Sequence, residues 1–217
     1  MNVMAGQSIF VSGIDTDAGK TYCTAWWAMQ LQKRGLKVIT MKFLQTGCVG
    51  SSEDIEAHRR ITGTGLLQED AQGLTCPVMF SYPASAQLAA RIDGVAVDLD
   101  AFDRARHELE ERYDVVLVEG AGGLMVPITD DFFAIDYAAA RNLPLALVTS
   151  SKLGSINHTV LSFEAVRRRG IALDAVLYNH YYDAAPEISA DTRAFVERYV
   201  AKHFPTVPVL DVPVMKK

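Results

Sequence analysis

The sequence predicts an α/β protein built on a doubly wound, mostly parallel sheet that carries helices on both faces. Two observations lead to this fold class. Short apolar runs alternate with longer helical patterns along the chain, and strand–helix alternation implies right-handed crossovers within one open sheet. The runs are also continuously apolar, as in Val115-Val116-Leu117-Val118, which is typical of parallel strands covered on both faces.

The first part of the chain already shows this alternation. An apolar run at residues 8–13 predicts the first strand. The pattern at 20–34 predicts a helix that ends at Gly35, because glycine suits the left-handed conformation after a helix C-terminus. A second strand is expected at 37–41 and a short helix at 53–61.

The middle of the chain is expected to begin with loops, at residues 63–73 and 93–97. A helical pattern follows at 98–112, and the apolar run at 114–118 predicts a buried strand. Another helical pattern follows at 132–141.

The last third of the chain repeats the alternation, and Gly170 is expected to close one of its helices. The expected elements are strands at 145–149, 173–178 and 207–210 and helices at 155–169 and 187–202. The whole chain of 217 residues is expected to form a single domain, residues 1–217, which suits the usual domain size.

The bulk composition excludes several classes of protein. A formal net charge of −5 argues against a general nucleic-acid binder. Three cysteines, Cys23, Cys48 and Cys76, form no C-x-x-C pair, which argues against a disulfide framework or a zinc site. Residues 1–7 do not resemble a signal peptide, and no stretch reaches the roughly 20 apolar residues of a membrane span. We therefore expect a cytoplasmic protein with no membrane partner.

The strongest motif follows the first strand and reads Gly13-Ile14-Asp15-Thr16-Asp17-Ala18-Gly19-Lys20-Thr21. Its end, Gly19-Lys20-Thr21, is the phosphate-binding core of a P-loop, in which the lysine neutralises the β- and γ-phosphates and the threonine hydroxyl binds Mg²⁺. Five residues rather than four separate Gly13 from Gly19, so the loop is a variant. An ordinary strand–turn–helix is the alternative, but the motif favours a P-loop NTPase-like fold.

In such a fold, ligands bind beyond the carboxyl ends of the strands, which draws attention to three further segments. Lys42 could reach a phosphate or substrate anion, or could be a solvated lysine at a strand end. Ser51 and Asp54 form a capping-box pattern, which we favour over a metal-binding role for Asp54. Glu119, followed by Gly120-Ala121-Gly122-Gly123, resembles a Walker-B-like metal ligand rather than a turn with an exposed glutamate.

Two later strand ends also carry polar residues. Ser155 is a good N-cap, and the free N–H groups behind it would form an anion site suited to a ligand carboxylate. His158 is expected to be a packed or hydrogen-bonded helix residue rather than a catalyst. The amide of Asn179 could pair with a nucleobase edge, or could make an Asx turn.

Taken in order, these motifs resemble the dethiobiotin synthetase family. The matching residues are Gly13-x-Asp15-Thr16-Asp17-x-Gly19-Lys20-Thr21, Lys42 with Thr46-Gly47, Asp54, Glu119-Gly120-Ala121-Gly122-Gly123 through Pro127, Leu153-Gly154-x-Ile156-Asn157-His158, and Asn179. The resemblance implies a homodimeric enzyme that closes a cyclic urea from 7,8-diaminononanoate, CO₂ and ATP with Mg²⁺. A carbamate would attack the γ-phosphate, and the second amine would then displace phosphate.

The resemblance also implies roles for individual residues. It implies metal binding by Thr21, Asp54 and Glu119, and catalysis by Lys42, Lys20 and Thr16. It implies nucleotide binding by Asp15, Thr16, Asp17, Ala18, Gly19, Lys20, Thr21, Tyr22, Glu119, Gly120, Gly122, Asn179 and Pro213. It implies substrate binding by Asp17, Lys42, Thr46, Gly122, Gly154, Ser155 and Asn157.

The chain departs from the family's pattern in four places. Asp17 stands where a glutamate is frequent, and Phe43 stands where a proline usually follows the lysine. Ser85-Ala86-Gln87 replaces a frequent Ser-Pro-His, and only four residues follow Pro213.

Two other classes of P-loop protein remain as alternatives. The ATPase half of a cobyrinate amide synthase needs a glutaminase partner domain, for which 217 residues leave no room. Switch ATPases of the MinD/ParA class typically carry an extra lysine early in the loop, and the stretch from Gly13 to Ala18 has none.

Overall fold

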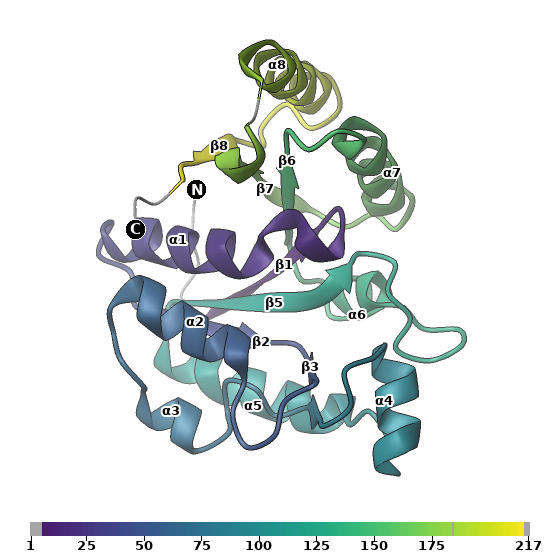
Figure 1. Ribbon diagram of the computed structural model, residues 1–217. Coiled ribbons are helices and arrows are strands. Elements are labelled where there is room, and N and C mark those ends of the chain that lie inside the picture. The colour runs from purple at the N-terminus through teal and green to yellow at the C-terminus, as the bar shows by residue number, and fades with distance from the viewer. Residues whose placement is uncertain (1–5, 184, 215–217) are drawn as a thin grey trace.

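The computed structural model describes residues 6–183 and 185–214, and its centre is a six-stranded parallel sheet (Figure 1). The strands run in the order β2-β5-β1-β6-β7-β8, and every pairing between them is parallel. They are β1 (Gln7–Gly13), β2 (Val38–Lys42), β5 (Val115–Gly123), β6 (Leu145–Ser150), β7 (Leu173–Asn179) and β8 (Val209–Val212). The fold class predicted from the sequence is confirmed.

Helices connect the strands and cover both faces of the sheet (Figure 1). The α-helices are α1 (Lys20–Gln32), α2 (Glu53–Thr62), α3 (Gln68–Ala71), α4 (Ala86–Asp93), α5 (Leu99–Arg112), α6 (Ala134–Ala140), α7 (Ser155–Arg168) and α8 (Pro186–His203). Two short 3₁₀ turns lie at η1 (Thr16–Ala18) and η2 (His180–Tyr182). Among the residues described here, no helix is long and apolar enough to cross a membrane.

Both faces of the sheet are apolar, which explains why its strands read as continuous apolar runs. On one face, Phe10 and Val118 pack against side chains of α5, α6, α7 and α8, including the buried Phe102 and Phe163. On the opposite face, strand residues such as Val11 pack against α1. The sheet therefore separates two cores, and each strand contributes to both.

Four short elements are absent from the sequence prediction. Helix α3 lies inside the stretch predicted as a loop at 63–73, and α4 precedes the predicted loop at 93–97. Strands β3 (Gln45–Thr46) and β4 (Met79–Phe80) pair in parallel beside the main sheet. Elements of two to eight residues carry too few repeats for apolar periodicity to mark them.

The strand order places the chemically interesting loops together. The chain passes from β1 outward to β2, returns to β5, and then crosses to β6 on the far side of β1. Such a reversal opens a crevice beyond the carboxyl ends of the strands. The loops after β1, β2 and β5 therefore meet at one edge of the sheet.

Candidate active site

A cleft of about 650 Å³ opens at this edge of the sheet. Its lining combines the glycine-rich loop after β1 with the ends of β2 and β5 and the start of α2. The lining residues are Thr16, Asp17, Gly19, Lys20, Thr21, Lys42, Leu44, Gln45, Thr46, Asp54, Glu119, Ala121, Gly122, Lys152 and Tyr182. Most of the side chains that the sequence marks as candidates therefore share one cavity.

The glycine-rich loop wraps around the ammonium group of Lys20. Nζ of Lys20 donates to the carbonyl oxygens of Asp15 and Thr16, at 3.1 Å and 3.0 Å. The Asp15 side chain stiffens the same turn, because its Oδ1 accepts from the backbone N–H of Thr16 at 2.7 Å. Burial lowers the pKa of Lys20 to about 8, against the opposing effect of the Glu119 carboxylate. The loop thus holds a desolvated cation ready for an anionic ligand.

Glycine is required at position 19 for two reasons, its positive φ angle and the lack of room for a Cβ atom. Its φ is +86°, and an added Cβ would lie 2.2 Å from Nδ2 of Asn179. That amide donates to the carbonyl oxygen of Ala18 at 3.0 Å, while Oδ1 accepts from the N–H of Tyr181 at 3.1 Å. Of the two interpretations of Asn179, the Asx turn is what the structure contains, and contact with a nucleobase stays a prediction.

Two further contacts link the loop region to the C-terminal third of the chain. The Tyr22 hydroxyl donates to the carbonyl oxygen of Pro213 at 2.6 Å. The Tyr182 hydroxyl donates to the carbonyl oxygen of Asp17. Predicted nucleotide-binding residues from both ends of the sequence are thereby brought together.

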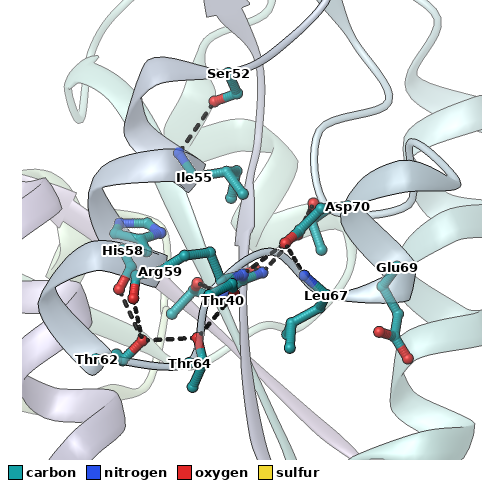
Figure 2. Close-up of polar contacts among 12 residues, drawn as sticks. Thr40, Ser52, Ile55, His58, Arg59, Thr62, Thr64, Leu67, Glu69 and Asp70 are labelled. Atoms are coloured by element: carbon teal, nitrogen blue, oxygen red, sulfur yellow. Dashed lines mark hydrogen bonds and ion pairs between the residues drawn. The ribbon is translucent and has the colours of Figure 1, made fainter.

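Three oxygen-bearing side chains converge where the sequence places a metal. Oγ1 of Thr21 lies 3.0 Å from Oδ1 of Asp54 and 2.9 Å from Oε1 of Glu119. Glu119 is 1% exposed, so the alternative of a turn with an exposed glutamate is wrong. The capping box of Ser51 with Asp54 is also wrong, because Ser52 is the N-cap of α2 and its Oγ accepts from Ile55 N at 3.2 Å (Figure 2). Asp54 therefore does not cap α2, and its side chain lines the cleft.

Lys42 lies between the two carboxylates rather than in solvent. Its Nζ is 2.6 Å from Oδ2 of Asp54, 2.9 Å from Oε1 of Glu119 and 3.2 Å from the carbonyl oxygen of Gly120. Burial alone would lower the pKa of Lys42, but the Glu119 and Asp54 carboxylates outweigh that effect and raise it. The interpretation as a solvated lysine at a strand end is excluded.

His58 belongs to the same cluster, and the sequence analysis missed it. Its Nε2 lies 2.6 Å from Oε2 of Glu119, and the side chain is fully buried. Burial would raise the pKa of Glu119, but Lys42 and His58 hold it well below its usual range. The spacing in the sequence could have indicated His58. It follows Asp54 by four residues, and residues i and i+4 share a helix face, so both side chains would be expected on the same side of the helix.

Figure 2 shows how the next residue, Arg59, fixes α2 in place. Its guanidinium donates to both oxygens of Asp70 at 2.8 Å, and to Oγ1 of Thr40 in β2 at 2.8 Å. The Arg59 and Asp70 side chains are only 5% and 8% exposed. The bond to Thr40 joins the helix that carries Asp54 and His58 to the sheet, and the buried pair with Asp70 joins it to α3.

Lys152 and Tyr182 also line the cleft and were missed. Nζ of Lys152 lies 5.8 Å from the centre of the Tyr182 ring. Their positions gave a weak signal: Lys152 comes just after β6, and Tyr182 is three residues after Asn179, so both follow strand ends.

The predicted carboxylate-binding segment lies outside this cleft. Gly154, Ser155 and their neighbours line a separate cavity of about 380 Å³. Gly154, with φ +93°, is the N-cap of α7, so the prediction that Ser155 caps this helix is wrong. The N–H of Ser155 already donates to the carbonyl oxygen of Lys152 at 2.9 Å, and Asn157 is exposed. Within one chain, the structure therefore does not bring Gly154, Ser155 and Asn157 to the P-loop.

Known proteins resemble this chain over most of its length. A family model described as an AAA domain matches residues 7–217. The ATP-dependent dethiobiotin synthetase BioD 2 of Pasteurella multocida is 45% identical over 196 residues, covering 90% of this chain and 92% of that protein. BioD of Chlorobaculum tepidum is 44% identical, covering 97% of this chain and 88% of that protein. BioD 2 of Haemophilus influenzae is 50% identical over 81% of this chain and 92% of that protein.

Solved structures support the fold alone. The signal recognition particle receptor FtsY from Elizabethkingia anophelis gives a TM-score of 0.51 at 16% identity, covering 98% of this chain and 60% of that one. The kinase domain of the Escherichia coli tyrosine kinase ETK gives a TM-score of 0.50 at 16% identity, covering 85% of this chain and 71% of that one. Because the synthetase relatives match over most of their length and the P-loop, Lys42, Asp54 and Glu119 motifs line one cleft, the chain belongs to the dethiobiotin synthetase family.

Proposed function

We propose that the chain is an ATP- and Mg²⁺-dependent ligase that converts 7,8-diaminononanoate and CO₂ to dethiobiotin, with release of ADP and phosphate. The observation that carries the proposal is the convergence of Thr21, Asp54, Glu119 and Lys42 beside the P-loop lysine. The relatives named ATP-dependent dethiobiotin synthetases support it at 44–50% identity.

The donor set fits Mg²⁺. The described residues contain no three His, Cys, Asp or Glu side chains that could hold a metal ion by themselves. They do bring together two carboxylates and one hydroxyl, from Asp54, Glu119 and Thr21. Mg²⁺ is usually bound by one or two carboxylates together with substrate phosphates and water. When bound, the ion would neutralise charge on the phosphates of ATP.

The lysines address the main electrostatic difficulty of the reaction. A carbamate and a γ-phosphate are both negative, so their approach requires positive charge on either side. Lys20 would hold the phosphates from the loop, and Lys42 would hold the carbamate and γ-phosphate from β2. Thr16 and Thr46 would donate hydrogen bonds to the same oxygens, and Asp17 would face the substrate amines.

The reaction then balances in three steps. One amine of the substrate adds to CO₂ and loses a proton, which gives a carbamate. A carbamate oxygen attacks the γ-phosphorus and ADP leaves, which gives a carbamic–phosphoric anhydride. The second amine attacks the carbonyl carbon and loses a proton to the departing phosphate or to water, phosphate leaves, and the five-membered urea ring closes.

We also propose that the enzyme is a homodimer and that Gly154, Ser155 and Asn157 receive the substrate carboxylate. Leu153, which lines that cavity, supports this proposal, because it is 90% exposed and offers apolar surface for a second chain, as does Leu161 further along α7 at 60% exposed. A cytoplasmic location, without nucleic-acid or membrane partners, stays a prediction from the sequence.

A product assay tests the proposed function. Purified protein is incubated with ATP, Mg²⁺, bicarbonate and 7,8-diaminononanoate, and the mixture is analysed by mass spectrometry for dethiobiotin. Each component is omitted in turn, and Lys20→Ala is the control for contaminating activity. ATP hydrolysis that ignores both diamine and bicarbonate would contradict the proposal and favour a switch ATPase, whereas glutamine-dependent amide formation would favour the amide synthases.

A further inference from the structure

Both oxygens of the Glu119 carboxylate are held by other side chains. Oε1 accepts from Oγ1 of Thr21 and lies 2.9 Å from Nζ of Lys42. Oε2 lies 2.6 Å from Nε2 of His58. Since Glu119 is 1% exposed, these contacts rather than water determine the direction of its carboxylate.

His58 acts as the hydrogen-bond donor in its contact with Glu119. Nζ of Lys42 forms an ion pair with the Glu119 carboxylate, and an ionised carboxylate only accepts hydrogen bonds. Nε2 of His58 must therefore carry a proton. The other ring nitrogen, Nδ1, is buried and has no partner among residues 6–183 and 185–214.

The unpartnered nitrogen indicates why an imidazole occupies this position. A buried polar atom without a hydrogen bond is unfavourable, so an apolar side chain would fill the same space at a lower free energy. Within the described residues, the contact with Glu119 is the hydrogen bond that an imidazole makes here and an apolar side chain could not make. Packing alone therefore does not account for the imidazole, but orientation of Glu119 does.

His58 also connects two proposed metal ligands that come from different elements. Asp54 and His58 are one turn apart on α2, whereas Glu119 lies in β5. Arg59 fixes this helix through its pair with Asp70 and its bond to Thr40 (Figure 2). Helix α2 thus supplies one ligand directly and sets the direction of the second.

We propose that His58 is a positioning residue for the metal site. By donating to Oε2 of Glu119, it turns Oε1 toward Thr21 and the cleft. The inference rests on the proposed Mg²⁺-dependent function, and it assigns a role to a side chain that does not itself touch substrate or metal. Groups that hydrogen-bond metal ligands typically change metal affinity by about 10–100-fold when they are removed.

The test measures Mg²⁺ affinity without turnover. Binding of the non-hydrolysable analogue AMPPNP is followed by calorimetry over a Mg²⁺ titration and again in EDTA. His58→Gln and His58→Asn form a matched pair, because the glutamine amide reaches the position of Nε2 whereas the asparagine amide stops near Nδ1. We expect His58→Gln to stay within about threefold of wild type and His58→Asn to lose at least about tenfold in Mg²⁺ affinity. AMPPNP affinity in EDTA should be equal in all three proteins.

Ile55→Val controls for lost stability, since it truncates a buried side chain of the same helix without removing a contact to Glu119. Equal Mg²⁺ affinity in the Gln and Asn variants would overturn the inference, and so would an equal loss in Ile55→Val. Failure of the proposed function gives a different result from failure of the His58 inference. If Mg²⁺ does not change the affinity of the wild-type protein for AMPPNP, the assignment of a metal site is wrong, whatever the His58 variants show.

Discussion

Lys20 lies folded over its own loop, and its ammonium donates to two backbone carbonyl oxygens, with which a phosphate would compete for the same donor. We predict that Lys20→Ala removes most turnover. Loss of one preorganised cationic donor should raise the barrier by on the order of 3 kcal/mol, or about a hundredfold in kcat. Steady-state assays of ADP release check the change, and circular dichroism checks that the variant is folded. Turnover within about threefold of wild type would exclude the P-loop role.

Asp54 and Ser52 stand two residues apart at the start of α2, and the structure gives them different tasks. Asp54→Asn should raise the Mg²⁺ concentration needed for half-maximal activity, because it removes the charge of a proposed metal ligand. Stability should change little, because Asp54 does not cap the helix. Ser52→Ala should leave that concentration unchanged and lower the free energy of unfolding by about 1 kcal/mol, since it removes the N-cap. Activity against Mg²⁺ and urea denaturation of both variants separate the two effects. A stability loss as the sole effect of Asp54→Asn would contradict its assignment as a ligand.

Individual residues were predictable from the sequence only where a motif fixed them. Lys20 and Thr21 follow from the loop, and Glu119 follows from a strand end that leads into glycines. His58 was missed because its partner, Glu119, is 61 positions away along the chain. Contacts of that kind depend on how α2 lies against β5, which no local pattern encodes.

The segment at the start of α7 is an element whose proposed task can be separated from that of the P-loop. Gly154 has φ +93°, and no described atom lies within 4 Å of an added Cβ. Gly154→Glu should weaken diamine binding by about tenfold, because a carboxylate would repel the substrate anion at the helix N-terminus. Gly154→Ala is the matched control, since it has the same backbone strain without the charge. Titrations with diamine and with AMPPNP check both variants, and equal losses of both affinities would make the segment structural.

Long elements were predictable because their periodicity repeats several times. Strands β1, β2, β6 and β7 overlap their predicted ranges closely, whereas β5 continues to Gly123, beyond its predicted end at residue 118. Helices α1 and α7 end at Gln32 and Arg168, shortly before Gly35 and Gly170, which adopt φ of +86° and +64°. The caps were displaced by one residue: Ser52 rather than Ser51 caps α2, and Gly154 rather than Ser155 caps α7. Neighbouring serines or a glycine–serine pair offer two competing caps, and tertiary contacts decide between them.

At the scale of the whole molecule, the buried ion pair of Arg59 and Asp70 joins α2 to α3. Burial would raise the pKa of Asp70, but the hydrogen bonds from Arg59, the Leu67 N–H and Thr75 together with the charge of Arg59 outweigh that effect and lower the pKa below the unfolded value of 3.8. A carboxyl whose pKa is depressed in the folded state stabilises the fold above the unfolded pKa. That stabilisation is lost as the pH falls through the folded pKa.

Asp70→Asn should therefore cost on the order of 3 kcal/mol of stability near pH 7, because Arg59 is left buried without its counter-ion. The difference from wild type should narrow as the pH falls below 3.8. Urea denaturation at a series of pH values checks the prediction. A difference that is constant with pH would show that the pair acts through packing rather than charge.

The fold class itself followed from the sequence because it depends on features that the whole chain repeats. Continuous apolar strands require two covered faces, and the structure divides its core accordingly between α1 on one side and α5 to α8 on the other. The order of the six strands in the sheet could not be predicted from the sequence, because the alternation of strands and helices does not show which strands pair.

The hydrogen bonds that join the nucleotide loop to the C-terminal third have a consequence for biosynthesis. Asn179 bonds to Ala18 across 161 positions, Tyr182 to Asp17 across 165, and Tyr22 to Pro213 across 191. A ribosome adds roughly 5–20 residues per second, so roughly 8–40 s pass before these partners of the loop are translated. The loop therefore leaves the ribosome well before the segments that complete its geometry. A nascent chain would gain its nucleotide site only once β8 has been released from the exit tunnel.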